Sequence, residues 1–446
     1  MAINENIKSN LNAACELTVR LNELVVLGND ETKEGDALRE ALHGVWIELP
    51  KQQRDLIQYL SADLDLLSGT ETVVISKVAV PRKSSRKPGA VQPPNLRHRV
   101  NKAIELGHWK GVLDLIRLDP IIWTAAQRAF LRAEAYRRIG LPAAAVAFYR
   151  FALTLEPKEW AYRTGIIQSL MAGSDIRELE AEIANVTRDP EAPAGALIIS
   201  AAALCRQFAA TRGEERRAYA ERVVDLTLLG LGKPLDIATR EPRLRYRARF
   251  MAAIALAELG KLRDAVAQAS EGIRECPEIP QLYIFRGVLN FQLGEQYVED
   301  FAASVKFGTT DPVPYGIMAS DSFRRRNFRE CLELSKTGLS LDPRPEFKAM
   351  FLMFQAISQF ELGGSSAGAL RLFEASRELD PENKTIQRNF DIMKARATQE
   401  RRQRFTDYLY TPDVVTSTLN KNREELMSGL PIEDFTESGR LAAMMA

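Results

Sequence analysis

Few residues of this sequence have the types and spacing that a reaction centre needs. The segment Gly364–Gly368 reads GSSAG and formally matches the G-x-S-x-G pattern, in which a serine nucleophile sits between a strand and a helix. Here the flanking patterns are both helical, so Ser366 is predicted to be a turn or N-cap residue. The GLGKP segment at Gly230–Pro234 resembles part of a phosphate-binding loop, but it lacks the first glycine and the final Ser or Thr.

The metal-ligating residue types are also scattered. No two of the three histidines have metal-ligand spacing, and none of the four cysteines forms a C-x-x-C pair. We therefore expect no metal, no cofactor and no catalytic residue, and we expect the protein not to be an enzyme. The unpaired cysteines favour a reducing, cytoplasmic location. These residues are His43, His98, His108, Cys15, Cys205, Cys276 and Cys331.

Two basic clusters have the residue types that bind acidic peptides, phosphate groups or RNA. Their aromatic residues are sparse, and the 60 basic residues of the chain nearly balance its 59 acidic ones. A solvated or salt-bridged helix face is the preferred interpretation, and nucleic-acid binding is the alternative. The clusters comprise Arg240, Arg243, Arg245, Arg247 and Arg249, and Lys394, Arg396, Arg401, Arg402 and Arg404.

The 446 residues divide by pattern and composition into four parts. Residues 1–67 carry three amphipathic stretches and are expected to form a small helical bundle. Residues 68–97 are rich in Ser, Pro, Gly and basic residues, which predicts a flexible linker. Residues 98–404 follow helical periods almost throughout, and residues 405–446 are expected to be a mostly flexible tail. We expect neither a secretory signal nor a membrane span.

A spacing of small, aromatic and proline residues recurs within the long helical part. Gly140, Ala145, Tyr149, Ala152 and Pro157 are separated by steps of 5, 4, 3 and 5 residues. The same steps occur within residues 252–277 and 355–381, and again within 325–343, where Arg326 replaces the glycine. Repetition of one spacing predicts repetition of one structural unit.

The residue types suit two antiparallel helices joined by a tight turn. Small residues such as Ala133 and Ala145 let the helix axes approach, the glycine ends the first helix, and the proline ends or starts a helix. In these positions residues 99–400 resemble tetratricopeptide repeats (TPRs), although the Trp-Leu-Gly opening of that family is largely missing. The resemblance implies an all-α, right-handed superhelical array with a C-terminal capping helix, preceded here by the small bundle.

The resemblance also implies a partner-binding surface. In that family the first helix of each unit lines a concave groove. Carrying the register over places aromatic and arginine residues there, which are the usual anchors of protein interfaces. The alternative is that some of these aromatic residues pack between units. The predicted partner-binding residues are Phe130, Glu134, Trp160, Arg163, Arg247, Phe250, Ile284, Phe351, Phe354 and Ser358.

These patterns favour a non-enzymatic scaffold or adaptor that binds another protein or peptide. The bundle is expected to serve as a second interaction or dimerisation module, which would make the protein a homo-oligomer. The alternative function is a helical-repeat nucleic-acid-binding protein that uses the arginine clusters.

Overall fold

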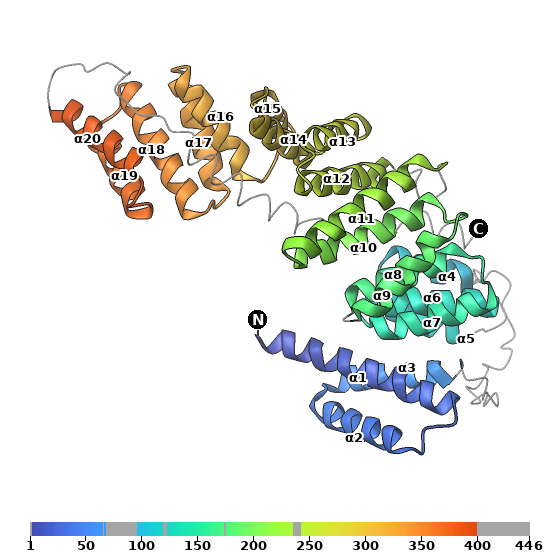
Figure 1. Ribbon diagram of the computed structural model, residues 1–446. Helices are drawn as coiled ribbons and strands as arrows, with labels where there is room; N and C mark the ends of the chain where they lie inside the picture. Colours follow the sequence, from blue (N-terminus) through green and yellow to red (C-terminus); the bar gives the residue numbers. More distant parts are fainter. Residues whose placement is uncertain are drawn as a thin grey trace, which may run out of the picture. The chain divides into compact units, whose positions relative to one another are not determined.

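The computed structural model describes residues 2–65, 67, 96–118, 123–173, 175–234 and 242–398. These ranges contain the helices α1–α20 and no strand (Figure 1), so the all-α prediction is confirmed. Within these ranges, no helix combines the length and the apolar character that crossing a membrane requires. The predicted linker and tail lie almost wholly outside the described residues, and the bounds of the four predicted parts stay predictions.

The helices form two compact units, each described here by itself. The described residues of the first unit extend to Ala203 and those of the second begin at Leu204, so the division falls within α10, Ala194–Ala210.

The first unit begins with three helices, as the amphipathic stretches predict. α1 (Ala2–Val26) packs against both α2 (Lys33–Glu48) and α3 (Lys51–Asp65). The side chain of Thr32 caps α2 by accepting a hydrogen bond from the backbone N–H of Gly35. α1 also contacts α7 (Pro142–Leu155), so the bundle and this helix of the array belong to one packed body (Figure 1). The buried bundle core comprises Ala14, Cys15, Val19, Leu38, Leu49, Leu56, Ile57, Leu60 and Leu64.

The hairpin of α6 and α7 shows why the recurring spacing specifies a repeat. Thr124 and Gln127 form a reciprocal capping box that starts α6 (Ala125–Ile139). Gly140 ends it at φ +92°, in the left-handed region that glycine enters at little cost. Ala133 and Ala145 are fully buried where the two helices meet. The remaining helices of this unit are α4 (Leu96–Glu105), α5 (Trp109–Leu118), α8 (Trp160–Ala172) and α9 (Ile176–Arg188).

The second unit consists of helices that pack consecutively, each against the next. Arg326 takes φ +59° at the turn where the other units carry glycine. α20 packs on α19 and buries Ile386, Phe390 and Met393, as expected of a capping helix. The helices are α11 (Gly213–Gly232), α12 (Pro242–Glu258), α13 (Leu262–Glu275), α14 (Pro280–Leu293), α15 (Val298–Lys306), α16 (Pro312–Arg324), α17 (Phe328–Ser340), α18 (Pro345–Glu361), α19 (Ser366–Leu379) and α20 (Lys384–Thr398).

Gly338 tests the small position of the recurring spacing. It lies in α17, and a Cβ added there would overlap the ring of Phe351 in α18. We expect Gly338→Ala to lower the free energy of unfolding by about 1–3 kcal/mol, because the packed ring has to move. Urea unfolding followed by far-UV circular dichroism measures this change.

The matched control for this variant is Gly368→Ala. A Cβ at Gly368 in α19 makes only ordinary contacts, the nearest at 3.7 Å. Its alanine variant should gain up to about 1 kcal/mol from helix propensity. Equal effects at the two glycines would show that the small position is not set by packing.

Candidate functional site

The predicted groove residues divide into two groups in the structure. Only Trp160, Arg163 and Arg247 are partly exposed to solvent. The expectation that all ten side chains line an open surface is therefore corrected, because the other seven are buried. The seven buried residues are Phe130, Glu134, Phe250, Ile284, Phe351, Phe354 and Ser358.

The buried aromatic residues pack between helices, as the alternative interpretation holds. Phe130 lies 5.7 Å from Tyr162 of the next hairpin, and Phe250 lies 5.3 Å from Phe285, measured between ring centroids. Ring pairs at such distances contribute packing energy to the core. These phenylalanines therefore stabilise the stack of repeats rather than offering their faces to a partner.

Glu134 is also occupied within the fold. Its carboxylate accepts a hydrogen bond from the hydroxyl of Tyr149 and one of 2.8 Å from Arg137 Nη2. Burial lowers the pKa of Arg137, but Glu134 and Tyr149 together raise it more, so that the pKa lies above its ordinary value. Glu134 is thus held as the buried acceptor of a structural network.

The three remaining groove residues keep solvent-accessible surface. The Arg163 guanidinium lies 5.9 Å from the ring centroid of Trp160, on α8 in the first unit. In the second unit, Arg247 on α12 lies at the same distance from the ring of Tyr246. Each pair combines a planar cation with an aromatic face, and these residue types anchor many protein interfaces.

The first arginine cluster belongs largely to internal ion pairs. Arg245 Nε lies 3.2 Å from Glu275 Oε1, and Arg249 Nη1 donates a 2.8 Å hydrogen bond to Gln268. Arg249 Nε lies a further 3.7 Å from the same Glu275 oxygen. These contacts fit the salt-bridged interpretation. Arg240 and the side chain of Arg243 lie outside the described residues.

The second cluster is described only at its beginning. Arg396 pairs with Glu361 and lies 5.1 Å from the ring centroid of Phe360. Its guanidinium is therefore engaged by α18. Arg401, Arg402 and Arg404 lie outside the described residues.

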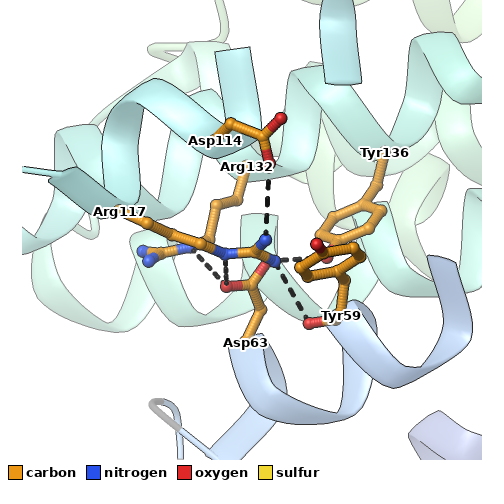
Figure 2. Close-up of polar contacts among 6 residues, drawn as sticks. All are labelled: Tyr59, Asp63, Asp114, Arg117, Arg132 and Tyr136. Atoms are coloured by element: carbon orange, nitrogen blue, oxygen red, sulfur yellow. Dashed lines mark hydrogen bonds and ion pairs between the residues drawn. The ribbon is translucent and has the colours of Figure 1, made fainter. Parts of the chain in front are cut away.

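A buried carboxylate joins the bundle to the repeats at a place that the sequence patterns did not single out. Asp63 of α3 is 2% exposed and receives hydrogen bonds from Arg117 of α5 at 3.1 and 2.6 Å (Figure 2). The Tyr136 hydroxyl of α6 donates to Asp63 Oδ2 at 2.6 Å. Arg132 Nε approaches Oδ1 at 3.4 Å. One acidic side chain thereby binds two basic residues and a tyrosine from the array.

The same arginine reaches a second atom of α3. Arg117 Nη2 donates to the backbone carbonyl of Tyr59 at 3.2 Å, and its guanidinium lies 4.6 Å from the Tyr59 ring centroid (Figure 2). Burial lowers the pKa of Arg117, but the hydrogen bonds and the charge of Asp63, together with Tyr136 and Asp114, outweigh this and hold the pKa above the ordinary value. Arg117 is therefore a charged side chain held against Asp63 by two hydrogen bonds.

Burial shifts the pKa values of the two other partners of Asp63 in opposite directions. It raises the pKa of Tyr136, and the nearby Asp63 carboxylate adds to this effect, so the phenol stays protonated and donates. Burial lowers the pKa of Arg132 despite the attraction of Asp63. The directional contacts of this cluster connect the bundle to the array.

The sequence carried a weak signal for this cluster. Asp63 lies on the apolar face of its helix, three residues after Leu60 and next to Leu64. A carboxylate on such a face needs a buried partner, since an unpaired buried charge is costly. Its partners follow 54 to 73 residues later in the chain, so the helical period does not identify them.

The residues that resemble reaction centres have structural roles. Ser365 is the N-cap of α19, accepting from the Gly368 N–H at 3.4 Å, and Ser366 is the first residue of that helix. All four cysteines are buried and none forms a disulfide, and burial raises the pKa of Cys15 to about 12 and that of Cys331 to about 11. Within the described ranges, no group of three His, Cys, Asp or Glu residues could hold a metal ion.

Comparison with known proteins gives structural likenesses only. No protein-family model and no curated protein matches the sequence. The C-terminal part of a TPR protein from Cytophaga hutchinsonii is 10% identical, with 66% of this chain and 98% of that chain covered and a TM-score of 0.38. A TPR protein from Parabacteroides merdae is 15% identical, with 67% and 97% covered and a TM-score of 0.32.

A third likeness is to the Cut9–Hcn1 hetero-tetramer of the APC/C. It is 13% identical over 87% of this chain and 66% of that chain, with a TM-score of 0.31. The described part of this chain is all-α, with an array of helices that pack consecutively, and the solved structures to which it is similar include TPR proteins.

Proposed function

We propose that this protein is a non-enzymatic, cytoplasmic scaffold that binds a polypeptide along the first helices of its hairpins. The observation that carries the proposal is the partly exposed pairing of arginine with aromatic rings on these helices, at Trp160 with Arg163 and at Tyr246 with Arg247. Most other side chains of these two helices are buried. The two pairs lie in different units and are proposed as two separate contact sites, each smaller than the groove expected from the sequence.

A polypeptide suits these two sites because it offers both oxygen acceptors and apolar side chains. Carboxylate and carbonyl oxygens of a peptide can accept from the guanidinium groups, and apolar side chains can cover the indole and phenol rings. Nucleic acid is the weaker alternative, because Arg245 and Arg249 of the first cluster are held by Glu275 and Gln268.

Truncating the exposed anchors should remove partner binding without unfolding the protein. We expect the triple variant Trp160→Ala, Arg163→Ala and Arg247→Ala to lose its polypeptide partners in an affinity pulldown by at least tenfold, because anchor residues each contribute about 1–2 kcal/mol or more. Quantitative mass spectrometry of the captured proteins measures this loss. Far-UV circular dichroism checks that helicity is unchanged.

A matched control uses exposed arginines on the second helices. Arg177 on α9 and Arg263 on α13 are both exposed, and their alanine variants should capture the same partners as the wild type. Capture that is indifferent to the triple variant would contradict the proposal. Salt-sensitive recovery of RNA or DNA in place of protein would favour the alternative function.

A further inference from the structure

A cleft opens in the first unit where α1 of the bundle meets α7, α8 and the start of α9. It has a volume of about 400 Å³ and is lined by residues of α1, α7, α8 and the start of α9. Its apolar floor includes Val19, Val146 and Leu170, each 7% exposed. Pockets that hold small ligands or peptide side chains have volumes of this order.

The rim of the cleft is acidic. Glu16 and Glu23 lie on α1 and are exposed, and Asp175 and Glu178 lie on the opposite side at the start of α9. With Arg20 and Arg150, the lining contains four carboxylates and two guanidinium groups, which leaves a formal charge of −2. A cleft with an excess of one sign of charge concentrates ligands of the opposite sign.

The two guanidinium groups are already near acidic partners. Arg150 on α7 forms an ion pair with Glu178 on α9. Arg20 lies 3.7 Å from Glu34, and both side chains are more than 60% exposed, which makes this pair weak. The exposed carboxylates of the lining are those of Glu16, Glu23 and Asp175, and Glu16 and Glu23 lie on α1 on either side of Arg20.

The spacing of these two carboxylates limits the shape of the ligand. Glu16 and Glu23 are seven residues apart on one helix, which corresponds to about 10 Å along its axis. A polyproline II segment rises about 3.1 Å per residue with three residues per turn, so side chains three positions apart lie on one edge about 9 Å apart. An extended peptide with basic residues three positions apart matches this spacing.

We propose that this cleft is a docking site for a short, extended basic segment of a partner protein, with an apolar side chain between two lysines or arginines. The basic groups pair with Glu16 and Glu23, and the apolar side chain covers the floor formed by Val19, Val146 and Leu170. This surface is separate from the exposed anchors on the first helices, so it does not depend on the function proposed above.

Fluorescence anisotropy with a labelled peptide tests the site in the full-length chain. The probe is Gly-Lys-Val-Pro-Lys-Gly, and the same peptide with glutamate in place of lysine is its control. We expect the lysine peptide to bind, the glutamate peptide not to bind, and affinity to fall steeply towards about 0.5 M NaCl, because exposed ion pairs are screened. Equal binding of the two peptides, or binding indifferent to salt, would overturn the proposal.

Two variants locate the binding on the protein. Glu16→Gln with Glu23→Gln should weaken the lysine peptide about fivefold, from two exposed ion pairs. Glu31→Gln with Glu40→Gln removes the same charge from exposed positions of the bundle outside the cleft and should leave affinity unchanged. If both pairs weaken binding equally, the peptide senses only net charge and the site is rejected.

A variant that fills the cleft tests the contribution of its shape independently of its charge. Ala147 is half-buried on α7 and lines the cleft, so Ala147→Leu should fill it and weaken the peptide while every carboxylate remains. Unchanged affinity in this variant, with helicity intact, would overturn the proposal. The triple variant at Trp160, Arg163 and Arg247 should bind the lysine peptide as the wild type does, which distinguishes this site from the proposed groove.

Discussion

Phe354→Ala should lower the free energy of unfolding of the second unit by about 3–5 kcal/mol. Phe354 is 2% exposed on α18, and its ring centroid lies 5.3 Å from that of Phe323 on α16. Removing the ring leaves a cavity between two hairpins that the backbone cannot close. The sequence pattern assigns this residue to the groove, so the result separates a core role from a binding role.

The distribution of tryptophan makes this measurement specific to one unit. All four tryptophans, at positions 46, 109, 123 and 160, belong to the first unit. Tryptophan fluorescence therefore follows the unfolding of the first unit by urea, whereas far-UV circular dichroism follows both units. We expect the Phe354→Ala variant to shift the circular dichroism transition and to leave the fluorescence transition in place.

An exposed residue at the C-terminal end of α18 provides the control for this variant. Leu362 is 49% exposed at the C-cap of α18, and Leu362→Ala should cost less than about 1 kcal/mol. An unchanged circular dichroism midpoint for Phe354→Ala would show that the side chain is not part of a packed core. A loss of partner binding in that variant would then report a direct contact.

Asp63→Asn should destabilise the first unit by about 3–5 kcal/mol, because it removes the charge that compensates two partly or fully buried arginines. Asp63 is the shared partner of Arg117, Arg132 and Tyr136. The asparagine has almost the same shape, so the loss arises from charge and hydrogen bonding rather than from a cavity. Urea unfolding followed by tryptophan fluorescence measures the effect in this unit.

A second acidic partner of Arg117 provides an internal control. Asp114 also lies near Arg117, at 3.8 Å, but its side chain is 58% exposed. Because solvent screens an exposed pair, Asp114→Asn should cost less than about 0.5 kcal/mol. Similar small effects for both aspartates would mean that the Asp63 cluster does not hold the bundle on the array.

Limited proteolysis adds a second readout for Asp63→Asn. If the cluster holds the bundle on the repeats, the variant should expose cleavage sites in α1 to α3 at protease concentrations that leave the wild type intact, because cleavage follows local opening. The core of the hairpin formed by α6 and α7 should stay protected. A wild-type cleavage pattern in the variant would show that apolar packing of α1 against α7 suffices.

The sequence by itself determined the hairpins of the array. Gly140, Ala145 and Pro157 define a turn, a close contact between two helices and a helix end, and each depends on chemistry within a few residues of the chain. The same holds for α20, in which Ile386, Phe390 and Met393 recur at helical spacing and are buried. Turns and helix ends of this kind depend on residues that are close in the sequence and not on the packing of distant helices.

Only the tertiary structure decided which faces of those helices remain exposed. Residues 351–358 of α18 are buried on every side of the helix, although the sequence pattern assigns Phe351, Phe354 and Ser358 to an open groove. Burial depends on the neighbouring hairpins, whose approach is set by many side chains at once. A register carried over from a family cannot supply that information when the opening residues of each unit differ.

The tertiary structure likewise decided what the bundle does with its buried carboxylate. The helical period placed Leu60 and Leu64 on the apolar face of α3 and therefore placed Asp63 there too. Its partners Arg117 and Tyr136 lie on other helices, 54 and 73 residues further along the chain. Helical periodicity describes contacts within three or four residues, whereas this ion-pair cluster is fixed by packing between elements that the sequence separates.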